Sequence, residues 1–493
     1  MTAPPDRRVF QNWLLILAGV FVIAWAVVRA SVQSITFDEA FTYLHFASQP
    51  LPTVWQPSSN NHVLNSLLMW IATHAFGTSN ITVRMPALLG AVLYVCVSYF
   101  LCKSLTNRLS LRLPLFICLT CNPFILDFMV AARGYSLANA FLLAAIAVPV
   151  WHRMKGRPSL RTSCVVASLA LGLSFAANFA FVFVDTAAFL ALLIWAIRRR
   201  EGESIARIAG FCALPGLAAA LLLCGYPLAH WPEEQWWGAH SLTEMRQSLV
   251  QSSFYQVDPR LPGAFHKAAN FLPLVPLLAV LCACQLVATR LGGAWLGRLA
   301  AALAGIVTLS AGMSWLAFRF YDLPLPLGRT GIYLVPLCTL LAAIIAAAPD
   351  QNRVSQWLRR GIAGVFICMA CYFLLCLRLS YFREYKWNAD VKEVYSVLAR
   401  LNHTYGVTDA QATGLYVSSL NYYRALSRRE TFPEFLLQNP ELSAGNSVYV
   451  VDRVLAREFI DKEKLAVVYR GKFSEVVVAV QPDGPIPPVM IEP

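Results

Sequence analysis

The sequence predicts an α-helical polytopic membrane protein with about eleven transmembrane helices and a C-terminal extracytoplasmic α/β domain. Of its 493 residues, 57% are hydrophobic and 14% are charged, and the mean hydropathy is +0.55. Such a composition is typical of chains that cross a membrane many times. Long apolar runs recur as far as residue 380, and from about Glu384 the composition becomes polar.

Apolar runs long enough to cross a bilayer define the predicted helices. The first follows Arg7 and Arg8, and we interpret it as an uncleaved span because no clear small-residue cleavage site follows it. The predicted spans lie at about 13–28, 82–103, 112–130, 135–151, 162–178, 180–197, 207–229, 268–289, 296–318, 328–348 and 359–380.

The positive charges predict the orientation of these spans. The formal net charge is +13, but arginines and lysines gather in short connections on one side instead of forming a basic face for nucleic acid. This places the N-terminus in the cytoplasm and the C-terminal domain outside. All thirteen cysteines lie in or at the edges of apolar runs, which excludes a disulfide framework in the exported domain. The absence of disulfides favours a bacterial inner membrane.

The first outer loop, at about 31–81, is long enough to be structured and functional. It carries two adjacent carboxylates, Asp38 and Glu39, and contains no lysine or arginine. An acidic pair near hydrocarbon needs a structural partner or a chemical task. The apolar segment 62–77 is short for a span, and counting it as one would invert every later loop. We therefore expect a helix at the outer surface, as for the segment 39–48.

The predicted domains are a transmembrane domain at 1–383 and a soluble domain at 384–493. In the second, residues 390–405 have the pattern of an amphipathic helix. Strand-like runs follow at 414–418, 447–451, 465–469 and 475–480.

Unusual polar residues collect on the outer side, in three separate loops: Asp38, Glu39, Asn60, Asn61, His62 and Arg84; then Asp127, Arg133 and Tyr135; then Arg319, Tyr321, Asp322 and Arg329. Arginine suits a phosphate because its planar fork donates two hydrogen bonds and stays charged. A carboxylate can accept a proton from a hydroxyl nucleophile.

Each residue also has a structural alternative. Arg84 is equally well explained as a residue at a helix start, and Arg133 as a partner of Asp127. Arg329 has the alternative of reaching to lipid headgroups. For His62 a hydrogen bond to a loop carbonyl is as good an explanation as catalysis. The aromatic outer connection at 230–266 favours interfacial anchoring over a substrate lid.

The ordered set of motifs resembles the GT-C superfamily of membrane glycosyltransferases, which includes protein O-mannosyltransferases (family 39) and the lipid A aminoarabinose transferase. The resemblance covers about residues 10–380. The motifs that carry it are Phe37-Asp38-Glu39, Asn61-His62-Val63-Leu64, Val83-Arg84-Met85-Pro86, Ala132-Arg133-Gly134-Tyr135-Ser136 and Leu327-Gly328-Arg329-Thr330.

The resemblance implies transfer of a sugar from a polyprenyl-phosphate donor to an acceptor hydroxyl, with inversion at the anomeric carbon. Asp38 would be the catalytic carboxylate and Glu39 its supporting neighbour. Arg133 and Arg329, with Arg84 and Tyr135, would bind the donor phosphate. Substrate contacts would come from Asn61, His62, Arg319, Tyr321 and Asp322. The acceptor is a lipid, a glycan or a protein, and the sequence departs from some family members at Ala131 and around Asn61-His62-Val63, where specificity would be set.

Some relatives use a divalent metal, and Asp38, Glu39 and His62 are acceptable ligand types. No ligand spacing supports such a site, so we expect no obligatory metal, with a divalent cation as the alternative. Two other classes of function stay open. A transporter or flippase of lipid-linked sugars predicts ionisable groups near the membrane midplane, where Asp185 is the candidate. A membrane-anchored sensor would not need arginines from two distant loops beside an acidic loop.

Overall fold

The computed structural model describes residues 5–155, 158–200, 202–231, 237–255, 257, 261–263, 274–289, 295–348, 352–427, 433–435 and 442–491. It consists of two compact units. Unit 1 comprises Met1–Val27, Pro57–Asn65 and Pro86–Leu377, and unit 2 comprises Val28–Gln56, Ser66–Met85 and Arg378–Pro493. Because these units are defined by contacts and not by the membrane, the domain boundary between residues 383 and 384 stays a prediction.

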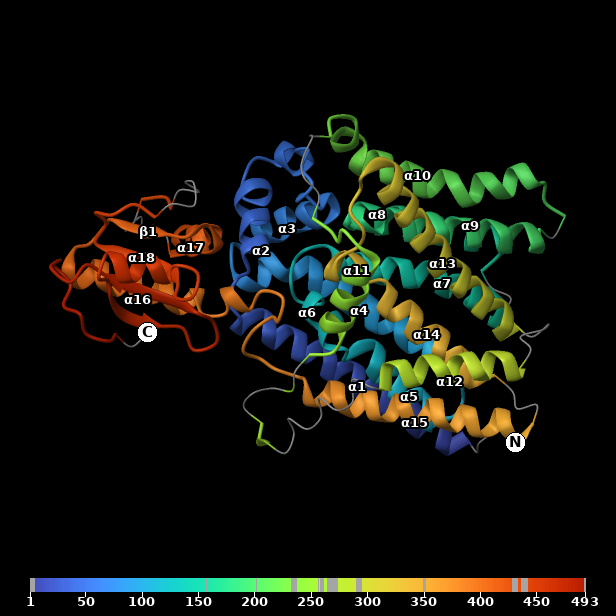
Figure 1. Cartoon of the computed structure of the whole chain (residues 1–493). Helices are drawn as coiled ribbons and strands as arrows, with labels where there is room; N and C mark the ends of the chain where they lie inside the picture. The colour runs from blue at the N-terminus through green and yellow to red at the C-terminus, as the bar shows by residue number, and fades with distance from the viewer. Residues whose placement is uncertain are drawn as a thin grey trace. The chain divides into compact units, whose positions relative to one another are not determined.

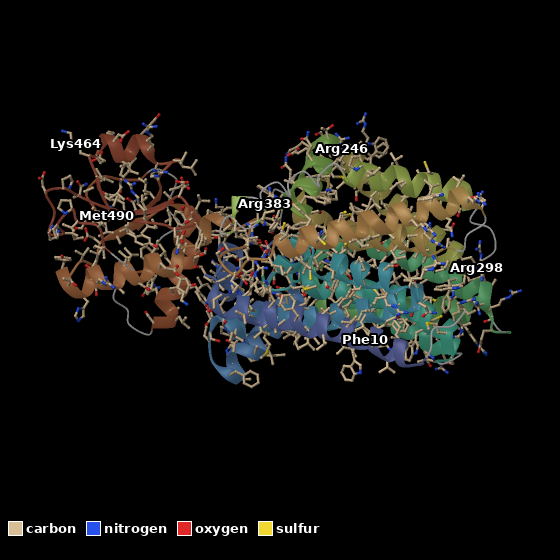
Figure 2. All side chains as sticks on the ribbon, turned by 90° about the horizontal axis from the view of Figure 1, so that it is seen from below. Phe10, Arg246, Arg298, Arg383, Lys464 and Met490 are labelled. Atoms are coloured by element: carbon tan, nitrogen blue, oxygen red, sulfur yellow. The ribbon has the colours of Figure 1, made fainter. Side chains whose placement is uncertain are left out.

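In the described part of the chain, nine helices are long and apolar enough to cross a membrane, which confirms the class of multi-pass membrane protein. They correspond to nine of the predicted spans. They are α1 (Pro5–Val32), α4 (Asn80–Leu105), α7 (Tyr135–Lys155), α8 (Leu160–Ala177), α9 (Val182–Arg199), α10 (Ile205–Ala229), α13 (Trp295–Tyr321), the segment Gly328–Ala347, which joins a 3-10 turn to α14 (Leu334–Ala347), and α15 (Arg353–Leu375). Figure 2 shows Phe10 projecting from α1, where it is 60% exposed, as a lipid-facing side chain would be.

The predicted span at 112–130 is wrong as a single helix. It is divided into α5 (Leu109–Thr120) and α6 (Pro123–Phe128). The division follows from Asn122-Pro123: the Asn122 side chain accepts hydrogen bonds from the backbone N–H groups of Phe124 (3.0 Å) and Ile125 (3.3 Å) and so caps a new helix. Proline at the first helical position has no N–H to leave unsatisfied.

Two further segments complete the helices of unit 1. The predicted span at 268–289 contains α12 (Leu274–Thr289), and residues 268–273 lie outside the described residues. Helix α11 (Leu242–Ser253) precedes it. Figure 1 shows α12, α14 and α15 running side by side, and these helices contact one another.

The segment predicted to be the first outer loop is structured, as expected. It contains α2 (Phe37–Thr42), a π-helical turn at Tyr43–Ala47, a 3-10 turn at Leu51–Trp55 and α3 (Val63–Phe76). At 14 residues, α3 is shorter than the roughly 20 residues that a helix needs to span a bilayer.

The C-terminal part of unit 2 is an α/β domain, as predicted. Its elements are α16 (Val391–Tyr405), β1 (Ala410–Ala412), α17 (Gly414–Ser427), β2 (Val448–Asp452), α18 (Arg457–Lys462), β3 (Ala466–Arg470) and β4 (Val476–Val480) (Figure 1). The strand order is β1-β2-β4-β3, with β1 parallel to β2 and the other pairs antiparallel. The two central strands β2 and β4 are buried along their whole length, as continuous valine-rich runs require.

The predicted strand at 414–418 is wrong, because these residues begin helix α17. Eight consecutive residues of α17, from Tyr416 to Tyr423, are buried, so this helix is buried all round and has no exposed face over that stretch. The short run Leu-Tyr-Val contains residues typical of strands, and periodicity over so few residues does not distinguish the two structures.

Candidate active site

Most of the predicted site residues fall into two clusters, one in each unit. The carboxylate cluster, in unit 2, consists of the predicted residues Asp38, Glu39 and Arg84 together with Tyr385, which was not predicted. The imidazole cluster, in unit 1, consists of Asn60, His62, Arg133, Tyr135 and Arg329.

A capping box at Thr36 fixes the backbone of the carboxylate cluster. The backbone N–H of Glu39 donates to the Thr36 hydroxyl (3.2 Å), and the backbone N–H of Thr36 donates to Oε2 of Glu39 (2.9 Å). This reciprocal arrangement starts helix α2. The local sequence Thr-Phe-Asp-Glu therefore holds both carboxylates in defined positions.

Glu39 and Arg84 form a fully buried ion pair. Nε of Arg84 donates to Oε1 of Glu39 (2.9 Å), and Nη2 donates to Oε2 (2.8 Å). Nη1 donates to the carbonyls of Ala30 (3.1 Å) and Gln33 (2.9 Å), and Nη2 also donates to that of Ser34 (2.7 Å). All five guanidinium donors thus have acceptors in the protein.

This geometry favours a structural role for the pair. Both Glu39 oxygens accept from Arg84, and Arg84 would lose existing hydrogen bonds if it bound a phosphate. Arg84 also lies over the ring of Phe382, at 5.2 Å from its centroid. The catalytic role of Glu39 and the phosphate-binding role of Arg84 stay predictions.

Asp38 has different surroundings. Its carboxylate is 8% exposed, and its Oδ2 accepts a hydrogen bond of 2.7 Å from the hydroxyl of Tyr385. Tyr385 precedes a short 3-10 turn at Lys386–Asn388, in which Asn388 accepts a hydrogen bond from the backbone N–H of Phe37 (2.9 Å). The turn therefore contacts both Asp38 and the residue before it. Sequence reasoning missed Tyr385, because no local pattern connects it to a residue 347 positions earlier.

In the imidazole cluster, Arg133 is held in a tight turn between α6 and α7. The carbonyls of Ala132 and Arg133 accept hydrogen bonds from the side chains of Asn65 (3.0 Å) and Asn178 (3.1 Å). Gly134 has φ +73, and a Cβ built on it would lie 1.9 Å from the carbonyl oxygen of Ala177. Only glycine fits this turn.

Asn60 orients the Arg133 side chain. Nη1 of Arg133 donates to the Asn60 carbonyl (3.2 Å), and Nη2 donates to Oδ1 of Asn60. Two hydrogen bonds from the planar guanidinium to one residue fix its direction. Asn60 was noted in the sequence as an outer polar residue, and its role as the partner of Arg133 was not predicted.

His62 is close to two arginines from distant loops, Arg133 and Arg329. Its side chain is 5% exposed, and neither ring nitrogen has a hydrogen-bond partner among the described residues. Burial, and then the charges of Arg133 and Arg329, lower the pKa of His62 well below its ordinary value. The imidazole is therefore neutral at pH 7, with one donor and one acceptor nitrogen, and its ring lies 5.9 Å from that of Tyr135.

Arg329 reaches this cluster from a 3-10 turn at Gly328–Gly331. The backbone N–H of Gly328 donates to the hydroxyl of Ser248 (3.0 Å), and the hydroxyl of Thr330 accepts from the backbone N–H of Leu327 (2.8 Å). Arg133 and Arg329, which the sequence placed on two separate loops, are thus both close enough to influence His62.

The other predicted residues divide between buried and exposed positions. Asn61, which precedes His62 in the sequence, is fully buried. Arg319, Tyr321 and Asp322, at the end of α13, are exposed, and Tyr321 reaches 80%. Within the described part of the chain, none of these three has a hydrogen bond or ion pair with the imidazole cluster, so their role in substrate binding stays a prediction.

The described residues contain no group of three or more His, Cys, Asp or Glu side chains placed to hold a metal ion. Of the ligand types named from the sequence, Glu39 has both oxygens bonded to Arg84. The residues present therefore do not fit a metal site of this composition, and metal independence stays a prediction.

No family model matches the chain, and no curated protein matches it in sequence. Three solved structures are similar to it. ArnT from Cupriavidus metallidurans in the apo state has 12% identity and a TM-score of 0.49, covering 96% of this chain and 98% of that one. Arabinosyltransferase EmbB from Mycobacterium smegmatis has 12% identity and a TM-score of 0.42, covering 87% and 44%. The Archaeoglobus fulgidus oligosaccharyltransferase has 12% identity and a TM-score of 0.42, and the match covers 93% of this chain and 73% of that one.

Proposed function

We propose that the chain is an inverting membrane glycosyltransferase that moves a sugar from a polyprenyl-phosphate donor to an acceptor hydroxyl. The observation that carries the proposal is the imidazole cluster, in which two arginines from distant loops are close to a buried neutral histidine. Two fixed positive charges beside an unpaired donor nitrogen are suited to a phosphate. The acceptor is a lipid, a glycan or a protein.

The phosphate gains negative charge as it leaves the sugar. Arg133 and Arg329 would stabilise that charge more in the transition state than in the bound donor, which is the condition for catalysis. His62 would donate its ring N–H to a phosphate oxygen, which would satisfy a nitrogen that otherwise costs about 1–3 kcal/mol as a buried unpaired donor.

Asp38 would accept the proton of the acceptor hydroxyl. General-base catalysis requires a carboxylate with a defined orientation, and Tyr385 supplies this by donating to Oδ2. One base and a good leaving group suffice for a single displacement. No covalent sugar–enzyme intermediate is needed, and the anomeric configuration inverts.

We place this activity at the outer face of a bacterial inner membrane, with the N-terminus in the cytoplasm and the C-terminal domain outside. The distribution of arginines supports this orientation. Labelling of single cysteines introduced into the C-terminal domain with a membrane-impermeant maleimide, in intact spheroplasts, tests it.

The decisive experiment compares purified wild type with Asp38→Asn on a panel of polyprenyl-phosphate sugars, and measures sugar release and donor binding. We expect wild type to consume one donor. Asp38→Asn should bind the same donor, but its turnover should be reduced at least about 100-fold, because a general base typically contributes that much. Arg133→Gln should weaken donor binding, and Arg207→Gln, an exposed arginine elsewhere, should not. An Asp38→Asn protein as active as wild type would contradict the assignment of the base.

Transport of lipid-linked sugars is the alternative, and a buried carboxylate within the helices favours it: Asp185 of α9 is 6% exposed. If wild type consumes no donor yet moves lipid-linked sugar across liposomes, and Asp185→Asn stops this, the transferase proposal fails.

A further inference from the structure

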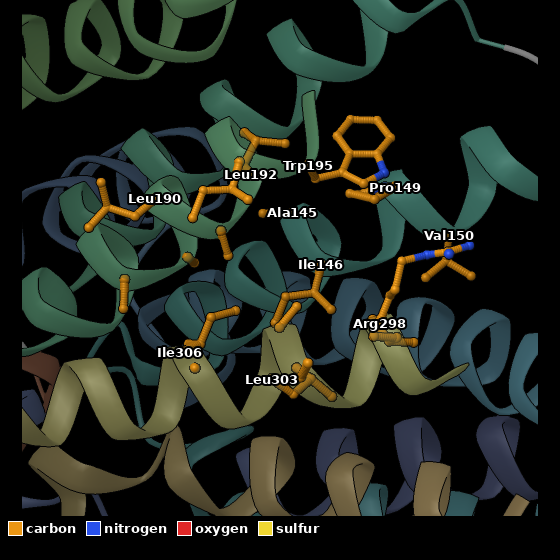
Figure 3. A pocket seen from close by; sticks show the side chains of 18 of the residues that line it. Ala145, Ile146, Pro149, Val150, Leu190, Leu192, Trp195, Arg298, Leu303 and Ile306 are labelled. Carbon is orange, nitrogen blue, oxygen red and sulfur yellow. The ribbon is translucent and has the colours of Figure 1, made fainter. Parts of the chain in front are cut away.

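A cavity of about 810 Å³ lies between α7, α9 and α13, all within unit 1. Its wall is mostly apolar, with Ile146, Val150, Leu192, Leu303 and Ile306 among the residues that form it. Figure 3 shows these side chains pointing into the space between the helices. Along α13 the lining runs from Trp295 to Leu309, which is about 21 Å of helix.

Four arginines line one end of this cavity: Arg153, Arg198, Arg199 and Arg298. All four are exposed (Figure 2 labels Arg298 on this unit). Arg153, Arg198 and Arg199 make no ion pair with a described residue, and no described carboxylate lines the cavity. The cavity therefore combines an apolar wall with a positively charged end.

Two tryptophans stand at the same end. Trp195 and Trp295 both line the cavity, and the guanidinium of Arg153 lies 5.5 Å from the ring centroid of Trp295. Tryptophan is enriched where a membrane meets water, at the level of lipid headgroups. The arginines are thus placed where a headgroup would be, and the apolar wall where its chains would be.

This end is remote from the imidazole cluster. Helix α7 begins at Tyr135, beside His62, and Arg153 lies 18 residues further along it. At 1.5 Å per residue the separation is about 27 Å, close to the thickness of the hydrocarbon core. The arginine end of the cavity therefore lies toward the membrane face opposite the imidazole cluster, the face that the arginine distribution predicts to be cytoplasmic.

We propose that this cavity binds an anionic glycerophospholipid of the cytoplasmic leaflet. Its headgroup phosphate would bind to Arg153, Arg198 and Arg298, and an acyl chain would pack against the apolar wall. Basic pockets between transmembrane helices on the cytoplasmic side bind anionic headgroups in this way. The positive-inside pattern alone accounts for arginines at this face, but not for a cavity with an apolar wall beneath them.

The fluorescence of Trp195 and Trp295 can be used to measure lipid binding. Brominated lipids quench tryptophan fluorescence on contact, so purified protein is titrated with dibrominated phosphatidylglycerol and, separately, with dibrominated phosphatidylcholine. We expect phosphatidylglycerol to bind at least about tenfold more tightly, because of its phosphate's unpaired negative charge. Trp195→Phe should lose part of the quenching amplitude.

Two matched sets of variants test the site. Arg153→Gln, Arg198→Gln and Arg298→Gln combined should abolish the preference for phosphatidylglycerol, whereas Arg207→Gln, Arg353→Gln and Arg360→Gln combined remove the same charge elsewhere and should keep it. Gly305 lines the cavity, and a Cβ there meets nothing within 4 Å, so Gly305→Leu should fill the cavity and weaken binding. Gly312→Leu, in equally open space on the same helix, should leave binding unchanged.

Equal binding of the two lipids by wild type would overturn the proposal. A preference for phosphatidylglycerol that survives the combined Arg153, Arg198 and Arg298 substitutions would also overturn it, as would unchanged binding by Gly305→Leu. Displacement of phosphatidylglycerol by polyprenyl phosphate at equal or lower concentration would also overturn it, because the cavity would then belong to the donor.

Discussion

Arg84 and Glu39 form a bidentate ion pair in which both side chains are completely buried, with hydrogen bonds of 2.9 and 2.8 Å. The remaining donors of Arg84 bind three carbonyls at the end of α1 and the segment after it. One guanidinium thus joins the start of α4, the acidic motif and the exit from α1. These contacts indicate that Arg84 stabilises the fold of the loop and does not bind the substrate directly.

We therefore predict that Glu39→Gln destabilises the protein. Removing one charge of a buried pair leaves the other uncompensated, at a cost of about 3–5 kcal/mol. The thermal unfolding midpoint in detergent should fall clearly. As a control, Glu475→Gln breaks an exposed pair of the same length, Arg453–Glu475 at 2.8 Å, and should cost at most about 1 kcal/mol. A Glu39→Gln protein with unchanged stability and no turnover would instead make Glu39 a catalytic residue.

Tyr385→Phe should reduce the turnover number about tenfold without changing donor affinity. It removes the hydrogen bond of 2.7 Å to Asp38 but keeps the ring and its packing. A hydrogen bond to a charged group contributes about 1.5–3 kcal/mol. Steady-state kinetics separate kcat from KM, and Tyr395→Phe, which loses a hydroxyl bonded to Ser427, is the control. If only KM changes, Tyr385 does not position the base.

The acidic motif could be identified from the sequence, because adjacent carboxylates stand out in an apolar chain. The capping box that starts α2 at Thr36 is a local pattern but was not predicted. The partners of the motif could not be predicted from any local pattern. Tyr385 lies 347 residues from Asp38, and the neutral state of His62 depends on burial and on the approach of Arg329, 267 residues later. The strand predicted at 414–418 was wrong because five residues carry too little periodicity to exclude a helix.

Gly134→Ala should destabilise the turn that presents Arg133 and weaken donor binding. The new Cβ would lie 1.9 Å from the Ala177 carbonyl oxygen, and the backbone has φ +73. Gly77→Ala is the matched control, because Gly77 has φ +78 but open space around its Cβ position. Gly77→Ala should reduce the free energy of unfolding by only about 1–2 kcal/mol, the cost of a left-handed backbone conformation for a residue with a Cβ. Equal losses of stability in the two variants would show that the Ala177 contact is unimportant.

We predict that chelators leave the activity intact. Both Glu39 oxygens are bonded to Arg84, and the described residues offer no cluster of metal ligands. Sugar release should be unchanged after dialysis against EDTA, with and without added Mg²⁺ or Mn²⁺. Loss of activity that a divalent cation restores would refute metal independence.

The last prediction concerns His62 and pH. Its pKa in the folded protein is well below the ordinary value of 6.5, because of burial and of the charges of Arg133 and Arg329. Between the two values the unfolded chain binds more protons than the folded protein, so stability falls as the pH drops below about 6.5. The contribution of neutral His62 is complete above that pH. We expect the unfolding midpoint of wild type to fall from pH 7 to pH 5, and His62→Gln to remove part of this decrease. His74→Gln, at an exposed position, should leave the decrease intact. If His62→Gln keeps the full pH dependence, the imidazole is not held neutral between the two arginines, and its assignment as a phosphate donor fails with it.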